Sequence, residues 1–146
     1  MIRPPKETEI PRLLELCAQH AAFEGAYFRL DGQEESLKKA LFGAPAILHC
    51  LVLEVDEQIE GYATFLPQYA TWEAAHYLYL DCLFLTEKMR RKGFGRQLMQ
   101  AVKAGAIRLG CTEIQWQTPG DNRQAIAFYQ TLGAKAKQKA RFFWTV

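Results

Sequence analysis

Residues 77–96 read YLYLDCLFLTEKMRRKGFGR, and this stretch decides the fold. Its first part, residues 77–85, is apolar apart from Asp81, as expected of a central strand that is covered on both faces. Its second part is a basic loop with two glycines, which opens a long amphipathic helix from Phe94 to a stop at Gly110. A strand, a loop and a helix in this order indicate an α/β domain that contains a parallel crossover.

Periodicity and turn residues predict the other elements. Thr8 is the expected N-cap of an opening helix, and Asp121 or Asn122 is that of the last helix, which stops at Gly133. The polar turn at 56–58 predicts an antiparallel hairpin. The expected helices cover residues 10–21, 37–41 and 122–132, and the expected strands cover 50–55, 59–65, 112–118 and 141–146.

The bulk composition is that of an ordinary globular domain. A chain of 146 residues with 49% apolar residues can bury one core, and its net charge of +2 gives no global argument for nucleic-acid or membrane binding. No apolar run approaches the roughly 20 residues of a membrane span, and the first residues lack the apolar core of a signal peptide, so a cytoplasmic protein is expected. The four cysteines and three histidines have no metal-ligand or disulfide spacing, and we expect no metal.

The basic loop has the features of a phosphate site. The first N–H groups of a helix have no partner within it and lie at the positive end of its dipole, so they donate readily to an anion. Two glycines in a first turn each weaken a helix by about 1 kcal/mol relative to alanine, which the close approach of a diphosphate to bare backbone can offset. Arg90, Arg91, Lys92 and Arg96 could neutralise the phosphates. A turn with solvated basic side chains is the alternative interpretation.

The loop matches neither the Walker motif nor the three-glycine Rossmann fingerprint, which disfavours nucleotide hydrolysis and dinucleotide redox chemistry. Residues 90–95, Arg-Arg-Lys-Gly-Phe-Gly, instead resemble the coenzyme A loop of the GNAT acetyltransferase superfamily, Gln/Arg-x-x-Gly-x-Gly/Ala. Asn122 at the next helix start and residues 128–134, Phe-Tyr-x-x-Leu-Gly-Ala, are also similar to this family. The resemblance spans about residues 77–134.

This resemblance implies an α/β fold with a mixed, mostly antiparallel central sheet, a parallel β-α-β crossover and helices on both faces. It also implies a single N-acetyltransferase domain over residues 1–146. Several short pieces are similar, more narrowly, to the spermidine/spermine and related diamine acetyltransferases. These pieces are Ile2-Arg3-Pro4, Phe23-Glu24, His49-Cys50-Leu51-Val52, Thr71-Trp72, Leu78-Tyr79-Leu80-Asp81 and Asn122-Arg123-Gln124-Ala125.

The activity that the resemblance implies is transfer of an acetyl group from acetyl-CoA to the primary amine of a small molecule, such as a diamine or polyamine. Such an amine has a pKa near 10.4 and arrives protonated, so a base must take its proton before it attacks. Asp81 matches the strand glutamate of the diamine enzymes, and it could act directly, through water, or by binding the substrate cation. A purely structural carboxylate is the alternative.

Tyr129 matches the superfamily's general-acid tyrosine, whose proton would reach the departing thiolate. Periodicity alone instead favours a packed tyrosine with a satisfied hydroxyl. Cys82 is not expected to carry the acetyl group, because neighbouring strand residues face opposite sides of a sheet. Direct transfer in a ternary complex is therefore the expected route.

The binding residues are assigned from the same resemblance. Phe23, Glu24, Trp72 and Asp81 are expected to contact the acceptor, although loop charges are more often solvated and a loop tryptophan often lies at a subunit contact. Asn122 can be an N-cap and a coenzyme contact at once. The residues expected to bind acetyl-CoA are Leu83, Phe84, Leu85, Arg90, Arg91, Lys92, Gly93, Phe94, Gly95, Arg96, Asn122, Gln124 and Ala125.

Three other functions remain open at this point. A sensor that binds acetyl-CoA without turnover would not need both Asp81 and Tyr129. A peptide or protein acetyltransferase would share the chemistry and differ in the acceptor. A nucleic-acid binder would need a wider basic surface than residues 90–92 offer. A homodimer is expected from the relatives and from the aromatic tail at 142–144, which needs burial.

Overall fold

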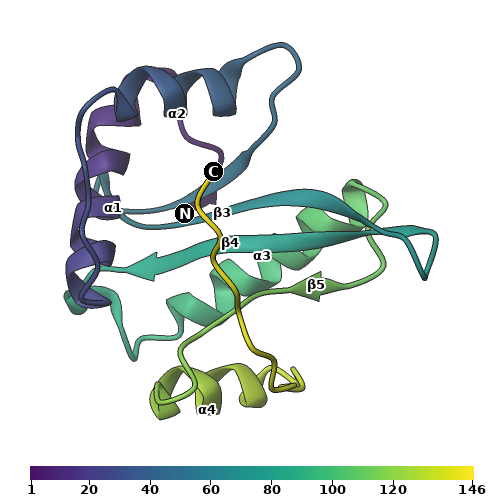
Figure 1. Cartoon of the computed structure of the whole chain (residues 1–146). Helices are drawn as coiled ribbons and strands as arrows, with labels where there is room; N and C mark the ends of the chain where they lie inside the picture. Colours follow the sequence, from purple (N-terminus) through teal and green to yellow (C-terminus); the bar gives the residue numbers. More distant parts are fainter. The chain divides into compact units, whose positions relative to one another are not determined.

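The computed structural model describes residues 1–146, which form two compact units, Met1–Trp116 and Gln117–Val146 (Figure 1). The first unit is built on a five-stranded sheet in the order β1-β2-β3-β4-β5. Neighbouring strands are antiparallel from β1 to β4, and β4 and β5 are parallel. The expected fold class is thereby confirmed. The strands are β1 (Ile2–Arg3), β2 (His49–Val55), β3 (Gln58–Ala70), β4 (Ala75–Leu85) and β5 (Ile114–Gln115).

The expected hairpin joins β2 and β3 through Asp56 and Glu57. Both residues have positive φ, 50° and 59°, which gives the two-residue turn the twist that antiparallel strands favour. β3 then continues to Ala70, five residues beyond the expected end at Phe65, and forms a second, longer hairpin with β4.

Three of the helices begin and end within two residues of the predicted positions, whereas α2 begins at Gln33, four residues before the predicted start. A 3₁₀ turn (η1) whose N-cap is Lys6 precedes α1, and the N-cap of α1 is Glu9, so the expectation that Thr8 caps the first helix is wrong. Gly110 follows the end of α3 with φ of 70°, as predicted for its stop. None of the helices is long and apolar enough to cross a membrane. The helical elements are η1 (Glu7–Glu9), α1 (Ile10–Phe23), α2 (Gln33–Phe42), η2 (Glu87–Met89), α3 (Phe94–Arg108) and α4 (Arg123–Thr131).

The two faces of the sheet are covered by different helices of the first unit. On one face, Val52, Tyr62 and Phe84 pack with the apolar side of α1 in a single buried cluster. On the other face, the ring of Phe65 lies against Gly105 of α3. Strand alternation explains the division, because Phe65 is three positions after Tyr62 in β3, and an odd offset places two side chains on opposite faces. The C-terminal end of β4 leads through a loop to the N-terminal end of α3, and this loop is the basic loop that the sequence predicts to bind an anion.

Gly61 lets β3 and β4 approach closely. A Cβ at this position would lie 2.5 Å from Leu85 Cδ2 and 2.8 Å from the carbonyl oxygen of Phe84. Because a backbone oxygen cannot move aside, we expect Gly61→Ala to lower the free energy of unfolding by about 1–3 kcal/mol. Gly120→Ala is the control, since that Cβ would meet no atom within 4 Å. Urea unfolding of both variants checks this, and equal stability would show that β3 and β4 are less tightly apposed.

Two strand predictions are wrong or too long. The strand expected over 112–118 is only Ile114–Gln115, because it pairs with β4 solely at Leu78 and Tyr79. The strand expected at Arg141–Val146 is absent. Its aromatic residues have strand propensity, but a strand exists only where another backbone accepts its hydrogen bonds, and residues 132–146 pair with none.

The second unit contains α4, whose start is capped as predicted. The side-chain oxygen of Asn122 accepts a hydrogen bond from the Ala125 N–H at 3.1 Å. The helix ends before Gly133, whose φ is 87°, and the Ala134 N–H donates to the Tyr129 carbonyl at 3.2 Å. Phe142, Phe143 and Trp144 are exposed.

Candidate active site

Asp81 lies on a β-bulge in the middle of β4. Thr64 of β3 is opposite Cys82, and the next residue, Phe65, is opposite Leu80, so Asp81 is an extra residue without a cross-strand partner. Such bulges re-aim a side chain and are common beside active sites. Here the bulge places an exposed carboxylate between the buried residues Leu80 and Phe84.

Beyond the bulge, one edge of β4 has no strand beside it. β5 pairs with β4 only at Leu78 and Tyr79. The N–H of Thr86 donates to the Glu60 carbonyl of β3 at 2.9 Å. Because successive residues of a strand direct their backbone groups to opposite edges, the N–H groups of Leu83 and Leu85 point away from β3. A ligand with amide groups could therefore add itself to this edge as a strand does.

The open edge leads into the start of α3. Gly93 is the N-cap, with φ of 83°, and no side chain caps the helix. The first backbone hydrogen bond of the helix runs from the Gln97 N–H to the Gly93 carbonyl at 3.2 Å. The N–H groups of Phe94 and Gly95 precede it and lie at the positive end of the helix. Arg91 and Lys92 are exposed beside them, so the chain offers both backbone donors and charge to an anion.

Arg90 is held differently from the other basic residues of the loop. Its Nε donates to the Leu85 carbonyl at 3.0 Å, and its guanidinium lies 4.0 Å from the centre of the Phe23 ring and 5.4 Å from that of Phe84. These contacts fix the loop to the end of α1. Arg90 thus holds the loop before α3 against the rest of the protein, and its guanidinium brings Phe23 beside that loop.

The C-terminal end of α1 lies beside the second half of β4. The His20 ring stacks on Phe84 with 5.1 Å between centroids, and its Nδ1 is 3.0 Å from the hydroxyl of the buried Tyr62. Its Nε2 is 3.4 Å from a carboxylate oxygen of Glu24. Glu24 is among the site residues expected from the sequence, whereas His20 and Tyr62 are not. Two sequence features could have indicated them: His20 is a polar residue near the buried side of α1, and Tyr62 is a tyrosine in a largely apolar strand.

Cys82 contacts Asp81 instead of facing away from it. Its Sγ donates to Oδ2 of Asp81 at 3.6 Å, so the expectation that the two side chains lie on opposite sides of the sheet is wrong. The bulge is the reason, because strict alternation holds only for a regular strand. Burial and the charge of Asp81 raise the pKa of the Cys82 thiol to about 12. A thiol with this pKa is almost wholly protonated at neutral pH and is a poor nucleophile.

We expect Cys82→Ala to retain acetyl transfer. Because the thiol is protonated, it should not accept the acetyl group, and its loss should change kcat by less than about threefold. Steady-state kinetics and mass spectrometry of the protein after acetyl-CoA alone check this. An acetylated Cys82, or a loss of activity in Cys82→Ala while Cys82→Ser stays active, would contradict it.

One predicted site residue, Trp72, lies away from Asp81 within the first unit, and four others belong to the second unit. Trp72 is 96% exposed and belongs to the turn between β3 and β4. Figure 1 shows this turn at the opposite end of β4 from the start of α3. At about 3.3 Å per strand residue Trp72 is roughly 20 Å from Asp81, and the structure does not bring the two together. Tyr129, Gln124 and Ala125 lie on α4 in the second unit, with Asn122 at its cap.

Comparison with known proteins identifies the family. The model of the acetyltransferase (GNAT) family matches residues 12–134, which is most of the chain. The chain therefore belongs to this family and is an acetyltransferase. Members of the family use acetyl-CoA as the acyl donor.

Several named relatives show what similar chains do. The thialysine N-epsilon-acetyltransferase of Bos taurus is 28% identical over 143 residues, covering 92% of this chain and 84% of the relative. An L-ornithine N5-acetyltransferase of Arabidopsis thaliana is 35% identical over 86 residues, covering 59% of this chain and 38% of the relative. The crystal structure of an aminoglycoside acetyltransferase from an uncultured soil metagenomic sample, in complex with sisomicin, has a TM-score of 0.85 at 21% identity. That match covers 100% of this chain and 95% of the solved one, and it supports the fold.

Proposed function

We propose that the chain transfers the acetyl group of acetyl-CoA to the primary amine of a small molecule, by direct attack in a ternary complex. One observation carries this proposal: an exposed carboxylate, Asp81, projects from a bulge where β4 becomes an unpaired strand edge. That edge leads, within one loop, to the uncapped start of α3. A base, an amide-binding edge and an anion-binding helix terminus thus follow one another along a single segment.

The donor is proposed to bind along this segment. The pantetheine amides would pair with the N–H groups of Leu83 and Leu85, which point away from β3. The diphosphate would accept from the first N–H groups of α3, with Arg91, Lys92 and Arg96 supplying positive charge. The uncapped helix start and the open edge fit a ligand with both amide and diphosphate groups. The backbone of Phe84 faces β3, so Phe84 is not proposed to hydrogen-bond the pantetheine; it would contribute only packing beside it.

Asp81 is proposed to take the proton of the bound ammonium, directly or through water. The carboxylate is exposed, and one of its oxygens accepts a hydrogen bond of 3.6 Å from the Cys82 thiol. Losing the proton frees the nitrogen lone pair, which forms the new C–N bond as the C–S bond of the thioester breaks. The electron pair of that bond goes to sulfur, and Tyr129 is proposed to supply the proton that completes the thiol. After the C–N bond has formed, the nitrogen still carries one extra proton; this proton is proposed to return to the Tyr129 oxygen through water, so that Asp81 retains the single proton that the overall reaction releases.

The acceptor class is proposed from two supports. Asp81 and Glu24 offer negative charge to a cationic amine, and Glu24 lies at the end of α1 beside His20. Curated relatives are named for acetylation of thialysine and ornithine, both of which carry a side-chain primary amine.

We propose further coenzyme contacts at Gln124, Ala125 and Asn122. We propose Phe23 as an apolar wall for the acceptor. We also propose that the protein is a cytoplasmic homodimer.

An amine-panel assay tests this function. Release of free thiol from acetyl-CoA is followed with diamines, amino acids that carry a side-chain amine, amino alcohols and peptides. We expect turnover with small cationic amines and little with peptides. Preferred acetylation of a peptide would replace the proposed acceptor, and tight coenzyme A binding without turnover of any amine would indicate a sensor.

A further inference from the structure

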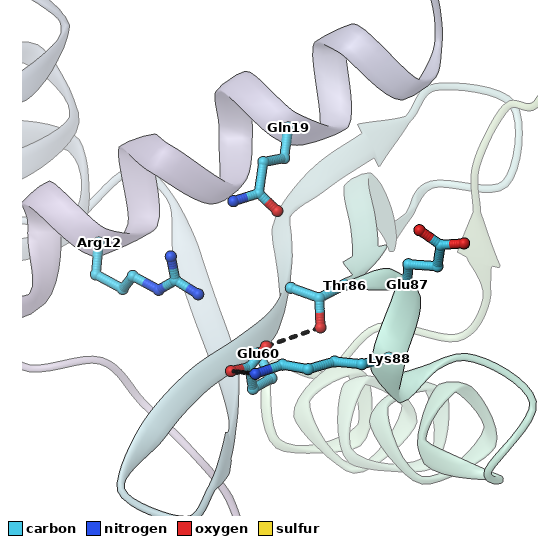
Figure 2. Close-up of a pocket in the computed structure, with 6 residues that line it drawn as sticks. All are labelled: Arg12, Gln19, Glu60, Thr86, Glu87 and Lys88. Carbon is cyan, nitrogen blue, oxygen red and sulfur yellow. Dashed lines mark hydrogen bonds and ion pairs between the residues drawn. The ribbon is translucent and has the colours of Figure 1, made fainter.

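A buried carboxylate stands where β3 meets the base of the coenzyme loop. Glu60 is 2% exposed, although the rest of this part of β3 is apolar. One of its oxygens accepts from the Thr86 hydroxyl at 2.8 Å, and the other is 2.6 Å from the ammonium of Lys88 (Figure 2). Both partners belong to the segment that joins β4 to α3, so a single side chain on β3 holds two points of that segment.

Backbone hydrogen bonds extend this anchor into the loop. The Thr86 N–H donates to the Glu60 carbonyl at 2.9 Å, and the Thr86 carbonyl accepts from the Met89 N–H at 2.9 Å. The latter bond closes the single turn η2, and the next residue is Arg90, which is clamped to Leu85 and Phe23. The course of the chain from Thr86 to the start of α3 is thus fixed at its base by Glu60.

The charges around Glu60 favour its ionised form. Burial raises its pKa, but the Lys88 ammonium and the Thr86 hydroxyl outweigh burial, and the net pKa is lowered. Glu60 lines a surface pocket, and Arg12 of α1 lines the same pocket (Figure 2). The Arg12 guanidinium donates two hydrogen bonds to the Ile59 carbonyl, at 3.0 and 3.1 Å. Gln19 and Glu87 complete the lining of the pocket. Because apolar residues of similar size often stabilise a core as well as a buried ion pair does, stability alone does not explain a carboxylate here, and a geometric role accounts for it.

We propose that Glu60 is a positioning residue for the donor site: through Thr86 and Lys88 it sets the place of the loop, and hence of the first amides of α3. The inference rests on the proposed binding of acetyl-CoA at that helix start. It assigns Lys88 to the anchor and not to the phosphates, because its ammonium is already bonded to Glu60.

A double-mutant cycle on Glu60→Gln and Lys88→Met tests the inference. Affinity for coenzyme A is measured by calorimetric titration, and kcat and KM for acetyl-CoA by steady-state kinetics with the amine that the panel identifies. We expect each single variant to weaken coenzyme A binding roughly fivefold to tenfold, and the double variant to be no weaker than either single one. We also expect KM to rise while kcat at saturating acetyl-CoA stays within about twofold.

Two further variants sharpen the cycle. Lys88→Arg keeps the ion pair with Glu60 and should restore near-normal affinity, whereas Lys103→Met removes an exposed cation of α3 and should change nothing. Lys88 is 63% exposed, so its replacement should not prevent folding even if Glu60→Gln proves unstable. Thermal unfolding of every variant separates loss of stability from loss of affinity.

Two results would overturn the inference. If Lys88→Met costs the same affinity in the wild type and in Glu60→Gln, Lys88 contacts the ligand itself and Glu60 does not act through it. If both variants lower the unfolding temperature but leave the affinity and KM unchanged, Glu60 is only a structural residue. A wild-type protein that does not bind coenzyme A would instead refute the proposed function.

Discussion

Replacing Asp81 with asparagine is expected to lower kcat at neutral pH by roughly a hundredfold or more, the usual contribution of a general base. Asparagine keeps the shape and can still accept the hydrogen bond of Cys82, so the bulge should persist. KM for acetyl-CoA should change little. Because the amine must then lose its proton to water, the residual rate should rise with pH towards the amine pKa of about 10.

Asp56→Asn is the matched control for this prediction. Asp56 is an exposed aspartate in the β2–β3 turn, where asparagine tolerates the positive φ of 50°. Full activity is expected for it. The pH dependence of kcat for both variants and the wild type gives the comparison. If Asp81→Asn keeps full activity across pH, Asp81 is structural and the base assignment is wrong.

Gly93→Asp is expected to weaken coenzyme A binding about a hundredfold, since a carboxylate at the helix start would repel a diphosphate that binds there. The protein itself should tolerate the change. A Cβ at Gly93 meets no protein atom within 4 Å; the φ of 83° strains any side chain there by about 1–2 kcal/mol, and aspartate and asparagine bear it better than most residues. Thermal unfolding should confirm that the variant folds.

Gly93→Asn separates charge from shape. It adds nearly the same side chain without the charge, so its affinity should fall far less than that of Gly93→Asp. Calorimetric titration with coenzyme A measures both. Equal affinities for the wild type and the two variants would mean that no phosphate lies at this turn.

The segment from β4 to the end of α3 is predictable from sequence because local chemistry decides it. The apolar run before Thr86 has the length of a buried strand, and the positive φ values of Gly93 and Gly110 require glycine-like residues at both ends of the helix. The Asn122 cap is predictable for the same reason. These features need only neighbours in the chain.

Features that depend on distant partners are not predictable in this way. The bulge at Asp81 arises from the register between β3 and β4, and no residue type marks it. Arg90 matches a coenzyme motif, but its contact with Phe23 depends on where α1 ends. The tail at 141–146 has aromatic residues and no strand partner. Glu60 was visible as an acid in an apolar strand, but its bonds to Thr86 and Lys88 were not.

The most direct test of the account is an NMR titration of the ¹⁵N-labelled protein with coenzyme A, and in parallel with pantetheine, which lacks the diphosphate. If the diphosphate binds at the start of α3, coenzyme A should shift the amide signals of Phe94, Gly95 and Arg96 strongly and pantetheine should not, whereas both should shift Leu83 and Leu85. Unchanged signals at the start of α3, with the largest shifts elsewhere in the chain, would contradict this binding.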